Sequence, residues 1–218
     1  MSTRYFLGRA SRLPDGTPSA IAKQAASTPL RLGPLGFAGD EQADRRFHGG
    51  PDQALHYCPA EHYAALAARF PLLQGFGPGD LGENISDTGW LEDDVRLGDV
   101  FALGDCRIAV TQPRVPCHKI AKRLDEPDAP AFVADTVRLG WYFRVIEGGV
   151  VQPDTPLTRV DSDLGAPSIA ALWHLRLDPA ADPALIGWLA THAALGGAWR
   201  AKFAQRAEWL ARNPPLFR

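Results

Sequence analysis

The sequence predicts a mainly β domain with flanking helices, followed by a small three-helix domain. Three observations lead to this prediction. Short apolar runs separated by turn residues fill the first part of the chain, which is typical of strands. Later segments alternate apolar and polar residues around short glycine-containing turns, which indicates hairpins. The last part of the chain instead repeats apolar residues at helical spacing.

The composition is that of a folded chain of medium size. Of the 218 residues, 45% are hydrophobic and 22% are charged, which excludes disorder for the bulk of the chain. The formal net charge of −2 argues against a general attraction to nucleic acid or to anionic membranes. We therefore expect neither nucleic acid nor membrane as a partner, and any anion site must be a local pocket.

Cysteine usage and the apolar runs indicate a cytoplasmic protein. The three cysteines are odd in number and irregularly spaced, which fits a reducing compartment better than a disulfide framework. The N-terminal residues lack an apolar core of signal-peptide length, and no run of about twenty apolar residues exists.

The first elements are predicted to be short strands followed by a helix. Residues 4–39 contain apolar runs that turn residues interrupt repeatedly, so we expect strands there. A helix is expected after Pro59, because Tyr63, Leu66 and Phe70 recur at helical spacing.

Two hairpins are predicted in the middle of the chain. The first joins residues 100–103 to 106–111 through a two-residue turn and makes Cys106 a small core residue. The second joins residues 141–146 to a run that begins at Val150. The helices predicted between these hairpins span 119–124 and 129–139.

The end of the chain is predicted to form three helices. Ser168 starts the first, Asp182 caps the second, and Gly196 precedes the third. A change of character before Ser168 divides the chain into domains 1–163 and 164–218. A domain as small as the second is marginally stable alone, so it should pack on the first domain or on a second subunit, and a homodimer is one expectation.

A polar loop over residues 39–55 is the first candidate site. Gly49 permits close approach of the backbone, and Arg45, Arg46 and His48 offer cationic or hydrogen-bonding groups to an anion. A solvated surface turn explains this loop equally well.

A glycine-rich loop over residues 75–89 is the second candidate. It contains Asn84, whose amide carries a donor and an acceptor in one plane and so suits the edge of a heterocycle. A turn or capping role is the alternative for this asparagine.

The third candidate loop presents Cys117 just after a predicted strand. Pro113 and Pro116 stiffen the segment, while Arg114 and Lys119 place positive charge nearby. Nearby cations favour the thiolate, which is the form that attacks electrophiles or binds metal. A buried structural cysteine is the alternative interpretation.

In their order and separation, these loops resemble those of the MOSC family, the molybdenum cofactor sulfurase C-terminal domain, and specifically its bacterial YiiM-like branch. The resemblance runs from about Ser19 to Asp161, and the predicted tail resembles the small helical domain that often follows MOSC in this branch. It implies a MOSC-type β-barrel with flanking helices. The segments that carry the resemblance are Gly39-Asp40-Glu41 through His48-Gly49-Gly50-Pro51, Gly82-Glu83-Asn84, and Gln112-Pro113-Arg114-Val115-Pro116-Cys117-His118-Lys119.

The resemblance also implies a cofactor and a reaction. Family members bind a molybdenum cofactor, molybdenum held by molybdopterin, and a cysteine at the position of Cys117 ligates the metal. They resemble reductases that detoxify N-hydroxylated compounds, such as hydroxylamino base analogues, with electrons from a separate electron-donating reductase. His48 is a candidate proton source. The candidate cofactor contacts are Arg46, His48, Gly49, Asn84, Arg114 and Cys117.

Three other functions are alternatives to this one. A cofactor carrier or sensor without turnover would use the same Cys117. A thiol hydrolase would need His118 or His48 as base, but an adjacent His118 points away from Cys117 in an extended segment. A structural zinc site lacks the usual C-x-x-C pair, since Cys58 and Cys106 lie far from Cys117 in the sequence.

Overall fold

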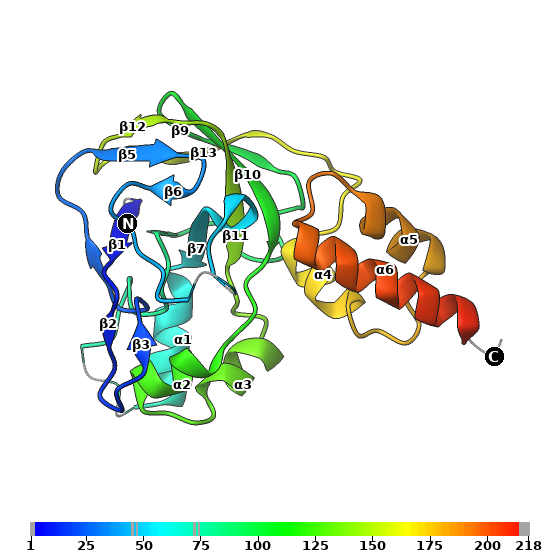
Figure 1. Cartoon of the computed structure of the whole chain (residues 1–218), viewed down its shortest axis with the longest axis horizontal. Coiled ribbons are helices and arrows are strands. Elements are labelled where there is room, and N and C mark those ends of the chain that lie inside the picture. Colours follow the sequence, from blue (N-terminus) through cyan, green and yellow to red (C-terminus); the bar gives the residue numbers. More distant parts are fainter. Residues whose placement is uncertain (1–2, 45, 47, 72, 74, 214–218) are drawn as a thin grey trace.

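The computed structural model describes residues 3–44, 46, 48–71, 73 and 75–213. Figure 1 shows a body of strands with helices below it, and further helices to one side that belong to the last part of the described chain. The described strands form an eight-stranded sheet in the order β13-β9-β10-β11-β7-β8-β1-β4, a three-stranded sheet β12-β5-β6, and the pair β2-β3.

The elements have the following bounds. The strands of the large sheet are β1 (Arg4–Gly8), β4 (Lys23–Ala25), β7 (Leu55–Pro59), β8 (Ile85–Asp87), β9 (Val100–Leu103), β10 (Cys106–Pro113), β11 (Trp141–Glu147) and β13 (Leu157–Asp161). The smaller sheets contain β2 (Ser11–Arg12), β3 (Pro18–Ser19), β5 (Leu30–Gly33), β6 (Gly36–Phe37) and β12 (Gly149–Val151). The helices are the 3-10 turn η1 (Pro51–Gln53), α1 (Glu61–Arg69), α2 (His118–Leu124), α3 (Ala129–Asp135), α4 (Ile169–Leu175), α5 (Pro183–Thr191) and α6 (Gly197–Arg212).

The strand pairings do not close the expected barrel. Among the described residues, the large sheet ends at β13 on one side and at β4 on the other, and no pairing joins these two strands. The start of β13 nevertheless lies beside the start of β1. Leu157 N donates to Thr3 Oγ1 at 3.1 Å, and Tyr5 Oη donates to Thr155 O at 2.6 Å. The two sides of the sheet therefore meet through side chains rather than through a main-chain ladder.

The first predicted hairpin is confirmed. β9 and β10 pair antiparallel across the two-residue turn, with Cys106 opposite Leu103, and the Cys106 side chain is fully buried. β10 also pairs with β11 along its length, so β10 lies inside the sheet and not at its edge. The Cys117 loop follows Pro113, the last residue of β10, and therefore begins at a fixed position in the middle of the sheet.

The second predicted hairpin is wrong, although both of its strands exist. β11 pairs with β10 and β7, whereas β12 pairs with β5 of the smaller sheet. The link between β11 and β12 explains the difference. A Cβ at Gly148 would lie 2.5 Å from Leu32 O, so the chain crosses from one sheet to the other by a close backbone contact that only glycine allows.

Helix α3 ends four residues earlier than predicted. It stops at Asp135 because Val137 adopts a φ of 54°, which no right-handed helix contains. The N–H of Arg138 then reaches back to Val133 O at 3.0 Å and closes the helix end. Thr136, which follows the last residue of the helix, is exposed.

Stacked and edge-on aromatic rings fill the centre of the body. Tyr57 on β7 stacks on Trp141 of β11 with ring centroids 4.4 Å apart, and Phe143 meets Phe101 edge-on at 5.5 Å. All four side chains are fully buried, and burial of each contributes about 1.5–3 kcal/mol to stability. This core fixes β7, β9 and β11, and β10, which leads into the Cys117 loop, is paired with both β9 and β11.

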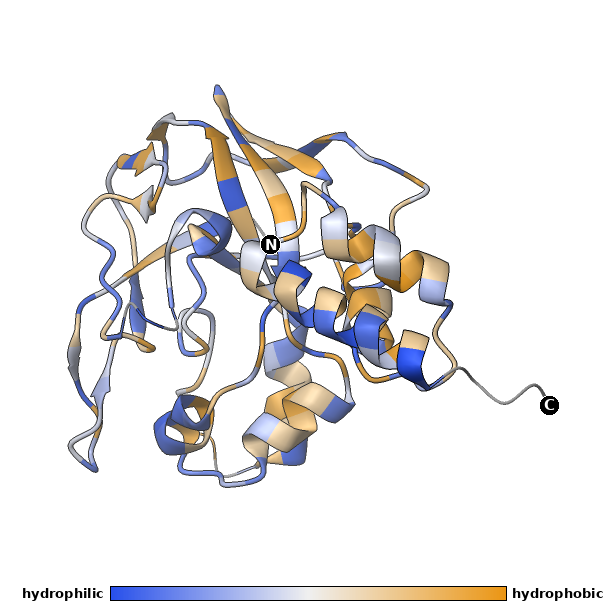
Figure 2. Cartoon of the chain, turned by 45° about the vertical axis from the view of Figure 1, so that its right-hand side comes forward, coloured by the Kyte–Doolittle hydropathy of each residue, from blue (hydrophilic) through white to orange (hydrophobic). Residues whose placement is uncertain are grey.

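The three helices of the tail lie where the sequence places them. Ser168 Oγ accepts from Ala171 N at 3.1 Å and Asp182 Oδ1 accepts from Ala184 N at 2.9 Å, so both predicted caps are confirmed. Such a cap is worth about 1 kcal/mol. Figure 2 shows hydrophobic and hydrophilic stretches alternating along these helices, as expected for helices with one buried face.

The tail packs on the body, which confirms one of the two expected arrangements. Leu97 N donates to Pro167 O at 3.0 Å and Ile169 N donates to Val95 O at 2.8 Å. The predicted boundary after residue 163 falls between β13 and α4, and independent folding of 164–218 stays a prediction. No helix in the described part of the chain is long and apolar enough to cross a membrane.

Candidate functional site

One pocket brings residues of all three candidate loops together. We call it the Cys117 pocket. The predicted site residues that line it are His48, Gly49, Asn84, Arg114 and Cys117. They come from three separate segments within residues 48–117, and the order β10-β11-β7-β8 in the large sheet brings these segments together.

Arg46 is the predicted cofactor contact that does not line this pocket. Its side chain is 80% exposed and forms a two-pronged ion pair with Asp44, with Nη2 to Oδ2 at 2.7 Å and Nε to Oδ1 at 3.0 Å. The role of Arg46 in cofactor binding stays a prediction. Arg45 lies outside the described residues.

Cys117 is the cysteine that reaches the pocket. It precedes helix α2 in an extended conformation, with φ −123° and ψ 162°, and is partly exposed. Cys58 and Cys106 are buried in the core, and burial raises the pKa of both thiols. A soft ligand for the pocket can therefore come from Cys117 and from neither of the others.

Arg114 gives the pocket a buried positive charge. The residue is 6% exposed, and its guanidinium Nη2 donates to Leu81 O at 3.2 Å. Among the described residues, no carboxylate lies within ion-pair distance of Arg114, and the same holds for Lys119, which also lines the pocket. A buried cation without a carboxylate partner, such as Arg114, favours an anionic ligand.

His48 faces these cations. Burial, Lys119 and Arg114 together lower the pKa of His48 below its usual value. Its imidazole is therefore neutral at neutral pH, and one ring nitrogen can donate a hydrogen bond while the other accepts one.

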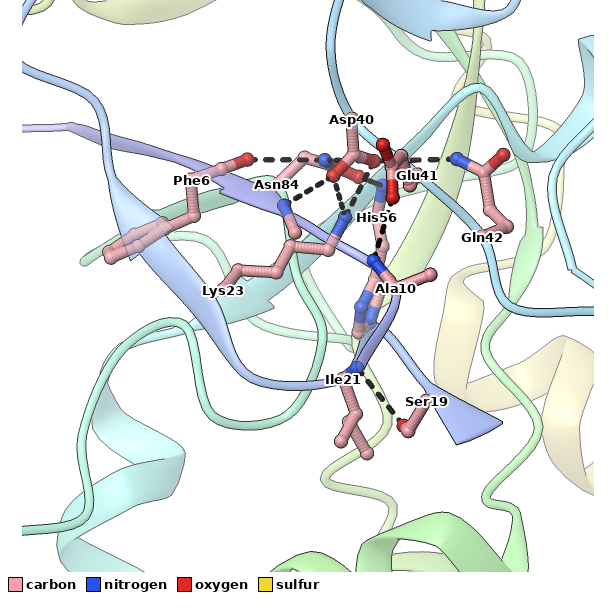
Figure 3. A network of polar contacts seen from close by, with 11 residues as sticks. Phe6, Ala10, Ser19, Ile21, Lys23, Asp40, Glu41, Gln42, His56 and Asn84 are labelled. Atoms are coloured by element: carbon pink, nitrogen blue, oxygen red, sulfur yellow. Dashed lines mark hydrogen bonds and ion pairs between the residues drawn. The ribbon is translucent and has the colours of Figure 1, made fainter. Parts of the chain in front are cut away.

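Asn84 is held in a network of polar contacts beside the pocket (Figure 3). Its Nδ2 donates to Asp40 Oδ2 at 2.9 Å and to Phe6 O at 3.2 Å, and its Oδ1 accepts from His56 N at 3.1 Å. Both amide hydrogens are thus used within the protein. The network gives Asn84 a structural role, and its predicted contact with a heterocycle stays a prediction.

The same network contains a buried ion pair that the sequence analysis missed. Lys23 Nζ lies 2.7 Å and 2.6 Å from the two carboxylate oxygens of Asp40, and the two side chains are 6% and 4% exposed. Burial lowers the pKa of Lys23, and the Asp40 carboxylate opposes this effect. The available signal was a lysine in an apolar run, since lysine is rarely buried without a partner.

Tyr142 and His56 are two further pocket residues that sequence reasoning missed. They lie on neighbouring strands β11 and β7, with ring centroids 5.3 Å apart. Burial raises the pKa of Tyr142 against the effect of Arg114, so the phenol keeps its proton at neutral pH. Burial and Arg114 lower the pKa of His56, so this imidazole is neutral.

The geometry does not favour His118 as the base of a thiol hydrolase, whereas His48, the other candidate base, lines the pocket together with Cys117. His118 is exposed and does not line the Cys117 pocket, so it is not placed to act as base for Cys117. The described part of the chain also contains no group of three or more His, Cys, Asp or Glu side chains that could hold a metal ion by themselves. A metal at Cys117 must therefore bring most of its ligands with it.

Comparison with known proteins places these features in a family. A family model of the MOSC domain matches residues 44–158. Protein YiiM of Escherichia coli is 41% identical over 177 residues, which are 79% of this chain and 79% of YiiM. A protein named Reductase from Gibberella moniliformis is 34% identical over 155 residues, which are 67% of this chain and 28% of that protein. The crystal structure of YiiM from Geobacillus stearothermophilus matches with a TM-score of 0.78 at 32% identity, covering 94% of this chain and 97% of that one.

Proposed function

The chain belongs to the MOSC domain family, and on this premise we propose that it is a molybdenum-cofactor-dependent reductase of N-hydroxylated compounds, such as hydroxylamino base analogues. The observation that carries the proposal is a single accessible thiol, Cys117, beside a buried Arg114 that has no carboxylate partner among the described residues. The name Reductase of the fungal relative supports an oxidoreductase.

The donor groups of the pocket fit the cofactor. Molybdopterin carries a dithiolene and a phosphate, so it supplies most of the metal's ligands and needs only one soft thiolate from the protein, which Cys117 offers. Arg114 and Lys119 offer charge-assisted hydrogen bonds to the phosphate or to other anionic oxygens. When bound, the cofactor supplies the two-electron redox chemistry, while the protein orients the substrate and handles protons.

The reaction requires protons as well as electrons. Conversion of an N–OH group to an amine consumes two electrons and two protons and releases one water. Two side chains of the pocket hold a proton near neutral pH: the phenol of Tyr142 and the imidazole of His48. We propose that these two groups donate hydrogen bonds to the substrate oxygen and relay protons to it from solvent, and we assign the electrons to a separate electron-donating reductase.

The ligand role of Cys117 is tested by metal analysis. The wild type, Cys117→Ala and Cys106→Ala are expressed in a host that produces the cofactor, and molybdenum per protein is measured by mass spectrometry. Near-stoichiometric molybdenum is expected in the wild type and in Cys106→Ala, because Cys106 lies in the core, and none in Cys117→Ala. A wild type without molybdenum, from a host that loads another molybdoenzyme, contradicts the cofactor assignment.

Turnover separates an enzyme from a carrier or sensor. The loaded wild type is mixed with an artificial electron donor and an N-hydroxylated base analogue, and the amine product is measured. An enzyme forms product in proportion to its molybdenum content. A protein that keeps its molybdenum but leaves the substrate unchanged is a carrier or sensor, and the reductase proposal is then wrong.

A further inference from the structure

The helical tail reaches the loop that forms one side of the Cys117 pocket. The 3-10 turn η1 directly follows Gly49 and Gly50, and both Gly49 and Gln53 line the pocket. η1 has no buried residue and no side-chain cap, so neither apolar burial nor capping holds it in place. A single turn of 3-10 helix is only marginally stable by itself, so its position must be set by contacts with other parts of the chain.

Asp52, the middle residue of η1, makes these contacts. Its Oδ2 accepts from Gly197 N, the first residue of α6, at 2.8 Å, and its Oδ1 accepts from Arg144 Nη2 at 2.9 Å. Its main-chain carbonyl accepts from Thr111 Oγ1 of β10 at 2.7 Å. One residue thus joins the pocket loop to the tail and to two strands of the large sheet.

Arg144 extends the same connection into the tail. Its Nη1 donates to Ala193 O and its Nη2 to Ala194 O, both at 2.9 Å, so the guanidinium spans from Asp52 to the segment before α6. These are charge-assisted bonds, which are stronger than neutral ones. The start of α6 is therefore fixed to the body through the same carboxylate that holds η1.

Close packing supports the polar contacts at this junction. A Cβ on Gly196 would lie 2.0 Å from Gln112 Oε1 and 3.3 Å from Asp52 Cβ. Gln112 is 3% exposed and lies on β10 two residues before Arg114. The tail therefore contacts both the loop that presents Gly49 and the strand that presents Arg114.

We propose that Asp52 is a positioning residue through which the C-terminal helices hold the loop 48–53 against the Cys117 pocket. It touches no ligand, and acts through Gly49 and Gln53. The tail is then a structural part of the binding site rather than an appendage. The proposal holds for any ligand of the pocket and does not depend on the identity of the cofactor.

Amide hydrogen exchange tests the proposal on the ligand-free protein. Gln53 N donates to Gly50 O at 3.1 Å, so its exchange reports the closed turn. In Asp52→Ala, exchange at Gln53 should accelerate by about tenfold, the effect of losing roughly 1.4 kcal/mol of hydrogen bonding. In Asp52→Asn, whose amide oxygen still accepts from Gly197 N, the acceleration should be smaller.

The matched control is Ser168→Ala, which removes the cap of α4 at a residue that does not line the pocket. It lowers stability by a comparable amount, so it separates global destabilisation from loss of the junction. Exchange at Gln53 should be unchanged in this variant. Equal exchange at Gln53 in Asp52→Ala and in the wild type, or equal acceleration in Ser168→Ala, overturns the proposal.

Ligand retention gives a second measurement. Purified from a cofactor-producing host, Asp52→Ala should carry several-fold less molybdenum than Ser168→Ala. If the wild type itself carries none, the proposed function fails while the exchange experiment still decides the role of Asp52. If Asp52→Ala keeps its full molybdenum content although exchange at Gln53 is faster, then Asp52 orders the loop 48–53 but does not contribute to ligand binding. That result contradicts the proposed role in binding.

Discussion

The buried guanidinium of Arg114 opposes folding in a way that a neutral side chain of similar size would not. It is buried, it donates to one main-chain carbonyl, and among the described residues it has no carboxylate partner. Desolvation of a charge opposes folding, and residues kept despite this effect commonly serve a ligand. Arg114 therefore allows a test that separates function from stability.

Arg114→Met should lose binding without losing stability. We expect its molybdenum content to fall to background, while its free energy of unfolding is unchanged or higher by on the order of 1 kcal/mol, because the desolvated charge is gone. Arg123→Met is the control, since Arg123 pairs with Asp80 and does not line the pocket. That variant should keep its molybdenum and lose stability by about 1 kcal/mol. A clearly destabilised Arg114→Met with intact binding would contradict this assignment.

At the residue scale, the sequence reveals the pocket residues that lie on loops and hides those on strands. His48, Arg114 and Cys117 stand out because polar and proline-bounded segments without periodicity are typical of sites. His56 and Tyr142 occupy ordinary strand positions, where alternation alone does not tell which face meets a cavity.

Among the elements, the turn before β11 is the one on which the pocket depends most directly. Gly140 has a φ of 64°, its carbonyl accepts from Arg114 N at 3.1 Å, and its N–H donates to the buried carboxylate of Glu92 at 2.7 Å. Glu92 in turn lies 2.8 Å from His62 Nε2 on α1. The turn thus links a helix, a strand and the pocket arginine.

Gly140→Ala should be far more damaging than Gly104→Ala. Both glycines have similar positive φ values, 64° and 60°, so both substitutions add about 1 kcal/mol of backbone strain. A Cβ at Gly140 would also lie 2.0 Å from Tyr57 O, whereas at Gly104 the nearest atom is 3.7 Å away. We expect a loss of about 3 kcal/mol or more at Gly140, measured by urea unfolding. Similar losses of stability at the two sites would contradict this prediction, because they would mean that the backbone near Gly140 moves to accommodate the added Cβ.

At the element scale, the sequence predicted hairpins where a short turn joins neighbouring strands. It did not predict pairings between strands that lie far apart in the sequence. The Gly104-Asp105 turn specified its hairpin because both strands meet across two residues. The similar glycines at 148–149 led to the wrong pairing, because the partner of β12 is β5, more than a hundred residues earlier. Closure of a barrel likewise depends on contacts between distant strands, which no local pattern records.

Across the whole molecule, buried ionisable groups couple stability to pH. His56 is buried, and its pKa in the folded protein lies well below the value of 6.5 expected in the unfolded chain. Below pH 6.5 the unfolded chain therefore binds a proton that the folded protein excludes. The stabilising effect of keeping His56 neutral is complete above pH 6.5 and is lost as the pH falls toward the folded pKa.

His56→Gln isolates this effect. Its stability relative to the wild type should improve by about 1.4 kcal/mol for each pH unit below 6.5, as measured by urea unfolding between pH 5 and pH 7.5. Burial also raises the pKa of Glu83, which acts in the opposite direction, but Glu83 is present in both proteins and cancels in the difference. A stability difference that does not change with pH would contradict a neutral buried His56.

The contacts between the start of β1 and the start of β13 have a consequence for the order in which the protein forms during synthesis. Thr3 accepts its hydrogen bond from Leu157, 154 residues later in the chain. At a synthesis rate of roughly 5–20 residues per second, Thr3 waits roughly 8–30 seconds for this partner. β1 can pair with β4 and β8 much earlier. The contacts of Thr3 and Tyr5 with Leu157 and Thr155 form only after the ribosome has made these later residues, so the two sides of the large sheet are joined late in synthesis, after β1 has its neighbours on both edges.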